Sequence, residues 1–178
     1  MTDTLGIQWY AVQVRPRYEL STAKILTGKG YDPFVPQYKS WHLWSDRRVE
    51  LALPLFPGYI FCRFDAQVRL PILITPGVMR IVGTSKRPVP VHASEIEAVQ
   101  TIVRIGHKAQ PHPFLAVGTK VRVQNGPLAG IEGIVQGYKN RQIIISIGLI
   151  QHSVAVDLDE HISVLERLSP DSQLAAAS

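Results

Sequence analysis

An eight-residue stretch without hydrophobic periodicity, Gly106 to Pro113, divides this chain of 178 residues into two parts. Its two prolines lack a backbone N–H and fix φ, so we expect it to form neither helix nor sheet. Residues 1–105 hold 13 Lys and Arg against 8 Asp and Glu, whereas residues 106–178 hold 6 of each. The net charge of +5 therefore belongs to the first part, as do 12 of the 14 aromatic residues. We predict a first domain over 1–105, a flexible linker over 106–116, a second domain over 117–167 and a disordered tail over 168–178.

The apolar content excludes a membrane-spanning helix. The longest apolar run, Leu51 to Cys62, is twelve residues long and contains two prolines, whereas a spanning helix needs about 20 apolar residues. The N-terminus carries Asp3 and has neither the basic region nor the small-residue cleavage pattern of a secretion signal, so we do not expect secretion. A single cysteine, Cys62, cannot form an internal disulfide and suits a reducing compartment. We expect a cytoplasmic protein with no membrane partner.

The first part mixes strand and helix patterns. Short runs rich in β-branched and aromatic residues predict strands, and apolar residues three to four apart predict helices. The expected strands are 9–14, 35–44, 47–53, 59–64 and 78–82, with Ser45-Asp46 as a hairpin turn. The expected helices follow Pro16, taken as a first-turn proline, then Asp65 as N-cap, and then Ser94, which forms a capping box with Glu97. These elements predict an α+β domain with an antiparallel sheet flanked by helices.

The second part contains strand patterns alone, separated by glycines. The expected strands are 120–123, 130–137, 143–150, 153–158 and 161–165. Five short strands in about 50 residues indicate a small all-β barrel.

Signals of catalysis are weak throughout the chain. Gly28-Lys29 is followed by glycine in place of the Ser or Thr of a phosphate loop, so it is better explained as the end of a helix. His107 and His112 lack the cysteines or carboxylates that would complete a metal site. Cys62 lies among apolar residues, which favours a buried, inert thiol. We expect a binding protein that uses no cofactor and no metal and is not an enzyme.

Two groups of residues are candidates for binding. Pro57-Gly58 predicts a turn that starts a strand in which Tyr59 and Phe61 share one face. That face is either part of the core or an exposed aromatic interface. Four arginines lie at expected turns or helix starts, where they could hold phosphates: Arg15, Arg17, Arg47 and Arg48. The modest charge indicates weak, sequence-tolerant contact with nucleic acid, and a solvated surface is the alternative.

At these residues the chain resembles the NusG family of transcription elongation factors, from Trp9 to about Glu166. Five motifs that look like those of the family occur in the family's order. They are Trp9-Tyr10-Ala11-Val12 with Glu19, Phe56-Pro57-Gly58-Tyr59, Pro76-Gly77-Val78, Arg87-Pro88 and the glycine-rich segment Val117 to Val135, which is similar to a KOW motif.

The resemblance implies an N-terminal NGN-type domain that binds RNA polymerase and an SH3-like KOW barrel that recruits a second partner. In the family, an aromatic face binds the clamp helices of the largest polymerase subunit, and a nearby helix start binds the gate loop of the second. The matching positions here are Phe56, Pro57, Tyr59 and Phe61 for the clamp helices, and Val68, Arg69 and Leu70 for the gate loop. Arg15, Arg17, Arg47 and Arg48 are the closest candidates for weak contact with non-template or upstream DNA. Ile150 matches the apolar barrel residue that inserts into a ribosomal small-subunit protein, and a termination factor is the other partner expected for the barrel.

The short hairpin turn and the segment Arg69 to Val78 look more like specialised RfaH-like or UpxY-like paralogues, which act on particular operons. We expect a monomer that suppresses pausing or termination. Two alternatives stay open, namely a ribosome- or RNA-associated KOW protein and a small enzyme with an unrecognised site.

Overall fold

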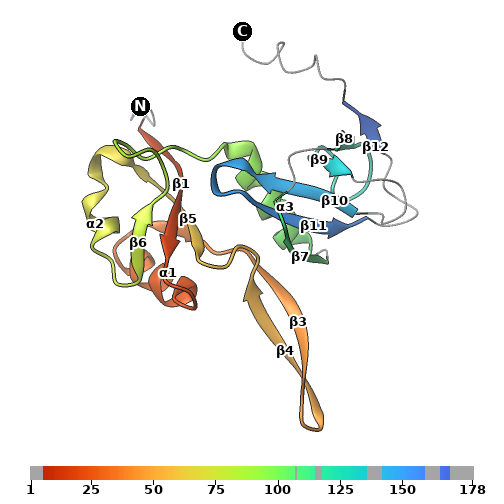
Figure 1. Cartoon of the computed structure of the whole chain (residues 1–178), viewed down its shortest axis with the longest axis horizontal. Helices are drawn as coiled ribbons and strands as arrows, with labels where there is room; N and C mark the ends of the chain where they lie inside the picture. The colour runs from red at the N-terminus through yellow and green to blue at the C-terminus, as the bar shows by residue number, and fades with distance from the viewer. Residues whose placement is uncertain (1–5, 107, 115–117, 136–141, 159–164, 169–178) are drawn as a thin grey trace. The chain divides into compact units, whose positions relative to one another are not determined.

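The N-terminal region of the computed structural model is built on a four-stranded antiparallel sheet with strand order β2-β5-β1-β6 (Figure 1). The structure describes residues 6–106, 108–114, 118–135, 142–158 and 165–168. The strands of the sheet are β1 (Ile7–Val14), β2 (Asp32–Phe34), β5 (Tyr59–Asp65) and β6 (Val78–Ile81). The helices are α1 (Glu19–Gly28), α2 (Leu70–Leu73), α3 (Ala93–Ile105) and the 3₁₀ turn η1 (Ala66–Val68). A separate two-stranded sheet pairs β3 (Gln37–Trp44) with β4 (Arg47–Pro54).

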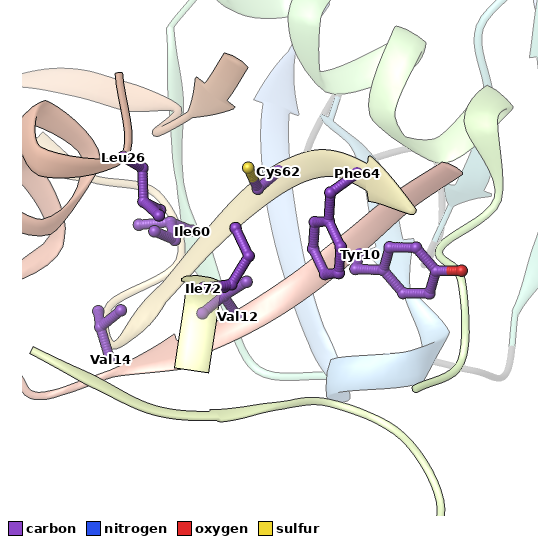
Figure 2. Packing of buried hydrophobic residues seen from close by; sticks show 8 residues of the cluster. All are labelled: Tyr10, Val12, Val14, Leu26, Ile60, Cys62, Phe64 and Ile72. Atoms are coloured by element: carbon purple, nitrogen blue, oxygen red, sulfur yellow. The ribbon is translucent and has the colours of Figure 1, made fainter. Parts of the chain in front are cut away.

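The core of this region lies on one face of the four-stranded sheet. Alternate residues of β1 and β5 point toward it, because side chains of a strand alternate between its two faces. They meet one side chain from α1 and one from α2 in a cluster formed by Tyr10, Val12, Val14, Leu26, Ile60, Cys62, Phe64 and Ile72 (Figure 2). The rings of Tyr10 and Phe64 lie 4.6 Å apart. Burial, with a smaller contribution from Asp32, raises the pKa of Cys62 to about 12, so its thiol is held protonated, in agreement with the inert thiol expected.

The C-terminal region is a six-stranded antiparallel sheet with strand order β12-β8-β9-β10-β11-β7. Its strands are β7 (Ala109–His112), β8 (Thr119–Val123), β9 (Glu132–Val135), β10 (Gln142–Ile147), β11 (His152–Asp157) and β12 (Leu165–Arg167), and the 3₁₀ turn η2 (Gly148–Ile150) joins β10 to β11. The predicted fold class, an α+β region followed by an all-β region, is confirmed.

The sequence was misleading about the segment between the two parts. Ala109–His112, expected to lie outside any sheet, pairs with β11, and Pro111 faces Val154 there. A proline is tolerated because β7 is the edge strand, where its missing N–H leaves no neighbour unpaired. The chain divides into two compact units between Glu97 and Ala98, within α3. The domain boundaries drawn from the sequence stay predictions, and the expected tail lies outside the described residues, apart from Leu168.

Three local expectations need correction. Pro16 lies in a turn three residues before α1 begins. Ser94 is not an N-cap, because α3 begins at Ala93 and the carbonyl of His92 accepts hydrogen bonds from the first turn. The helix expected after Asp65 is divided into η1 and α2, although Asp65 does cap η1 by accepting a bond from the Gln67 N–H at 2.8 Å. Most of the strand expected over 161–165 lies outside the described residues.

Candidate functional site

The turn Phe56 to Tyr59 is the best-defined element among the candidate binding residues. The Tyr59 N–H donates to the Phe56 carbonyl at 3.1 Å, and Gly58 has φ +82°, as the second central residue of a type II turn requires. The Gly58 carbonyl accepts a bond from the Val14 N–H at 2.8 Å, which ties the turn to β1. The Pro-Gly turn expected from the sequence is therefore confirmed.

A buried carboxylate holds the same turn from the other side. Glu19, the first residue of α1, is 5% exposed, and its Oε1 accepts a hydrogen bond from the Gly58 N–H at 2.7 Å. Such a bond to a charged acceptor is stronger than one between neutral groups. The carboxylate also lies in the first turn of the helix, where the dipole favours negative charge. Glu19 belonged to the sequence motif, but its contact, 39 residues along the chain, could not be read from spacing.

The aromatic residues after the turn divide into buried and accessible ones. Phe56 is 1% exposed and Phe61 is fully buried, and their rings meet edge to face at 5.5 Å. Phe34 from β2 lies 6.4 Å from Phe61. The expectation of an exposed face made by Phe56, Tyr59 and Phe61 is therefore wrong for the two phenylalanines, which serve as core. Pro57 is exposed and Tyr59 is half-buried, so these two carry the accessible part of the surface.

The sheet face that carries Tyr59 and Phe61 includes polar pairs that the sequence did not indicate. The Arg63 guanidinium lies 5.8 Å from the ring centre of Trp9, and the two residues face each other across β1 and β5. The Arg80 Nε donates to the Gln13 Oε1 at 2.7 Å. Only the strand register brings these side chains together, so no local motif could have revealed them.

The second candidate surface surrounds α2. Val68, Leu70 and Ile74 are 59%, 65% and 66% exposed, and Arg69 is exposed as well. The sequence assigned Val68, Arg69 and Leu70 to binding, and the structure adds Ile74 and the partly exposed Leu73. Burying only Ile72 of this short helix leaves its other apolar side chains in water, which is typical of an interaction surface.

Hydrogen bonds from α1 fix this second surface. The Lys29 Nζ donates to the Pro71 carbonyl at 3.0 Å and to the Thr75 Oγ1 at 2.9 Å. The Thr22 Oγ1 donates to the Pro76 carbonyl at 3.1 Å, next to Gly77, whose φ is +92°. The helix α1 and the residue that follows it thus order both candidate surfaces, one through Glu19 and the other through Thr22 and Lys29.

The four candidate phosphate-binding arginines lie on two elements. Arg15 and Arg17 occupy the connection between β1 and α1, where Arg17 has φ +70°, and Arg47 and Arg48 begin β4. All four are exposed. Both positions suit contact with a charged backbone.

The residue expected to insert into a partner of the barrel is not accessible. Ile150 ends η2 and is 6% exposed, since this turn directs it inward before Gln151 reverses the chain with φ +52°. Leu149, beside it, is half-buried and Gly148 is exposed. A residue that inserts into a partner has to be accessible, so the burial of Ile150 does not support the contact expected of it.

The described residues contain no cluster of three His, Cys, Asp or Glu that could hold a metal ion. His107 lies outside these residues, and His112 is part of β7, where its Nδ1 lies 2.7 Å from the Pro113 carbonyl oxygen. None of the helices in the described part of the chain is long and apolar enough to cross a membrane.

Comparison with known proteins connects these features to one family. The family model described as "Transcription termination factor nusG" matches residues 7–100. The "Transcription termination/antitermination protein NusG" of Escherichia coli (strain K12) is 27% identical over 178 residues, covering 89% of this chain and 96% of that protein. The protein of the same name from Yersinia pestis is 28% identical over 175 residues, with the same coverage. A solved structure, "Domain interaction in Thermotoga maritima NusG", has a TM-score of 0.53 at 18% identity and covers 88% of this chain and 96% of that chain, which supports the fold.

Proposed function

Because the chain belongs to the NusG family of transcription termination and antitermination factors, we propose that it binds RNA polymerase through its N-terminal domain. The observation that carries this proposal is the Phe56 to Tyr59 turn, which is held by Glu19 on one side and by β1 on the other. Such fixation presents Pro57 and Tyr59 in one conformation, so little entropy is lost when a partner binds. Phe56 and Phe61 are buried beside the turn, so they contribute to polymerase binding only by supporting it.

Contact with the polymerase divides between two surfaces in this proposal. The turn with Tyr59 binds the clamp helices of the largest subunit, and the apolar residues around α2, from Val68 to Ile74, bind the gate loop of the second subunit. The exposed side chains at α2 suit an apolar partner, since their burial is favourable by about 25 cal/mol per Å². Bridging two subunits would hold the polymerase closed, and this would suppress pausing and oppose termination.

The nucleic-acid contacts are weaker in this scheme. The exposed arginines Arg15, Arg17, Arg47 and Arg48 lie along non-template or upstream DNA and add a salt-sensitive contribution to binding. Their effect should decline as salt rises, whereas burial of apolar surface persists.

The second domain recruits a ribosomal small-subunit protein or a termination factor. With Ile150 buried, we place the contact on the neighbouring Gly148, Leu149 and Gln151, where the turn between β10 and β11 is accessible. This links transcription to translation in the cytoplasm, on particular operons if the chain is a specialised paralogue, with the factor acting as a monomer.

The test combines polymerase pull-down with transcription across a terminator. Wild-type chain should bind polymerase and increase read-through, and Tyr59→Ala should lose both while it still folds, as a cooperative urea unfolding transition would show. Tyr18→Ala, which removes an exposed tyrosine from the start of α1, serves as the matched control. Wild-type polymerase affinity in Tyr59→Ala would refute the proposed surface. Binding of ribosomal RNA without polymerase would instead favour a ribosome-associated protein.

A further inference from the structure

The hairpin formed by β3 and β4 exposes large apolar side chains that the core does not use. Trp41 is 65% exposed, and Leu43 and Trp44 are each 75% exposed. The two strands form a sheet of their own, drawn in orange tones in Figure 1, and among the described strands no third one pairs with them. A two-stranded sheet by itself is only marginally stable in water, and further strands are the usual way to stabilise it. The hairpin is therefore suited to accept another strand.

The outer edge of β3 presents backbone groups that do not bond to β4. At the base of the hairpin the Leu55 N–H donates to the Pro36 carbonyl at 2.8 Å, in line with the register of the two strands, which continues without a bulge to the turn. Bonded and non-bonded pairs alternate along an antiparallel ladder. Since Pro36 belongs to a bonded pair, the even-numbered residues of β3 bond to β4. The N–H and C=O groups of Lys39, Trp41 and Leu43 therefore point away from it.

This edge is complementary to itself. When two copies pair antiparallel about a two-fold axis at His42, Trp41 of one copy lies opposite Leu43 of the other, and the reverse pair forms at the same time. Directly opposed residues share a face of the sheet, so the two pairs form one apolar patch. An axis at Trp41 would instead place the ammonium group of Lys39 opposite Leu43. The register about His42 is thus the one that matches apolar residues with each other.

The charges of the hairpin favour the β3 edge over the β4 edge. The outer edge of β4 presents Arg48 and Glu50, which lie opposite Leu43 and Trp41. Pairing through β4 would desolvate both charged groups for an ion pair of small benefit, and it would leave the apolar residues of β3 in water. Pairing through β3 keeps the charges of β4 at the outer margins of the sheet, where water solvates them. Lys39, the charged residue on the β3 edge, is paired with Glu50 of its own hairpin at 3.2 Å.

We propose that two copies of the free chain pair through β3 and form a four-stranded antiparallel sheet with strand order β4-β3-β3-β4. The same edge is used by both copies, so the contact is isologous and closes at two copies. A tryptophan can bury about 150–250 Å², so Trp41, Leu43 and Trp44 of both copies come close to the lower limit of stable interfaces, about 1,200 Å² in total. We therefore expect a reversible dimer with a dissociation constant of about 10⁻⁵ M. The proposal concerns the free chain and does not rest on the proposed function, in which one copy acts on each polymerase.

Sedimentation velocity of the full chain measures this self-association. Between about 1 and 100 µM protein, a range that brackets the expected dissociation constant, the sedimentation coefficient should rise from that of a monomer to that of a dimer. Trp41→Lys and Leu43→Lys should each weaken the dimer by about tenfold or more, because the new charge faces an apolar side chain. Met79→Lys introduces the same charge at a side chain that is 59% exposed outside the hairpin, and this matched control should dimerise like the wild type.

A cysteine at the proposed axis tests the register. Because His42 bonds toward β4, it would form a non-bonded pair with its counterpart in the second copy, and such pairs have Cα atoms about 4.5 Å apart. This distance lies within the range of about 4.4–6.8 Å that disulfides require. His42→Cys should therefore give a crosslinked dimer under mild oxidation. Val49→Cys, opposite His42 on β4, is the control and should crosslink much more slowly. Cys62 does not interfere, because it is buried.

Four results would each overturn the proposal. They are a monomer at every concentration, a dimer that persists in both lysine variants of β3, loss of the dimer in Met79→Lys, or faster crosslinking of Val49→Cys than of His42→Cys. A monomeric chain whose Trp41→Lys variant no longer pulls down polymerase would assign the edge to the polymerase instead. Because no polymerase is present in sedimentation or crosslinking, failure there leaves the pull-down result for Tyr59→Ala intact and separates the two proposals.

Discussion

Replacing Glu19 by alanine should destabilise the N-terminal unit and loosen the turn that presents Tyr59. The substitution removes the acceptor of the 2.7 Å bond from the Gly58 N–H, together with a negative charge in the first turn of α1. A hydrogen bond to a charged group contributes about 1.5–3 kcal/mol, and a favourable charge at a helix N-terminus adds about 0.3–1 kcal/mol. We therefore expect Glu19→Ala to lower the free energy of unfolding by about 2–4 kcal/mol.

Urea unfolding monitored by circular dichroism measures the change in stability, and polymerase pull-down measures its consequence. Glu19→Gln keeps an oxygen acceptor without the charge, so it should lose about half of the stabilisation. In Glu19→Ala, Gly58 would be held only through its carbonyl, so polymerase binding should weaken in the order wild type, Glu19→Gln, Glu19→Ala.

A control variant makes this reasoning refutable. Glu97→Ala removes an exposed carboxylate from a helix and should change the free energy of unfolding by less than about 0.5 kcal/mol. If Glu19→Ala proves as mild as Glu97→Ala, the buried bond to Gly58 is not what orders the turn. The assignment of α1 as the element that orders the Tyr59 surface would then be abandoned.

Two other substitutions test the core and the α2 surface. The pKa of Cys62 is raised from 9.0 to about 12 by burial and Asp32, so the folded state keeps a proton that the unfolded state loses as pH rises. The contribution of the Cys62 proton to stability is fully present below pH 9.0, and the free energy of unfolding should fall by about 1.4 kcal/mol per pH unit above it. Urea unfolding from pH 8 to about 10 measures this slope, which should be absent in Cys62→Ala. An equal slope in both chains would contradict the assignment. Gly77→Ala would place a Cβ 2.2 Å from the Thr22 Oγ1 at a φ of +92°, so it should lower the free energy of unfolding by more than about 2 kcal/mol. An unchanged urea midpoint in Gly77→Ala would show that the contact between α1 and the loop before β6 yields easily.

Local patterns sufficed for most of the elements. The alternation in Tyr59 to Phe64 and the Pro57-Gly58 turn are properties of neighbouring residues, so they could be predicted without knowing the fold. The aromatic residues show the limit of that reasoning. Alternation establishes that Tyr59 and Phe61 share a face, but it cannot decide how deeply each is buried, since that depends on Phe34 and Phe56 from other segments.

The sequence did not reveal that the tryptophans of the hairpin are exposed. A hairpin over 35–53 was expected, yet its apolar residues look from the sequence like those of any half-buried sheet. Their exposure follows from the pairing of β3 and β4 with each other alone, since neither strand joins the four-stranded sheet. Ile150 was expected to contact a partner and is instead buried, because a short 3₁₀ turn that no local sequence signal predicts directs it inward.

The strand β7 has a practical consequence for dividing this protein. It covers β11, with Ala155 opposite Gln110, and the Asp157 N–H donates to the Lys108 carbonyl at 3.1 Å. A fragment starting at residue 117, where the sequence would place the second domain, lacks this cover and leaves the backbone groups along one side of β11 unpaired. Exposed strand edges with apolar side chains promote aggregation. A fragment of the second domain intended for study in isolation should therefore start before Lys108.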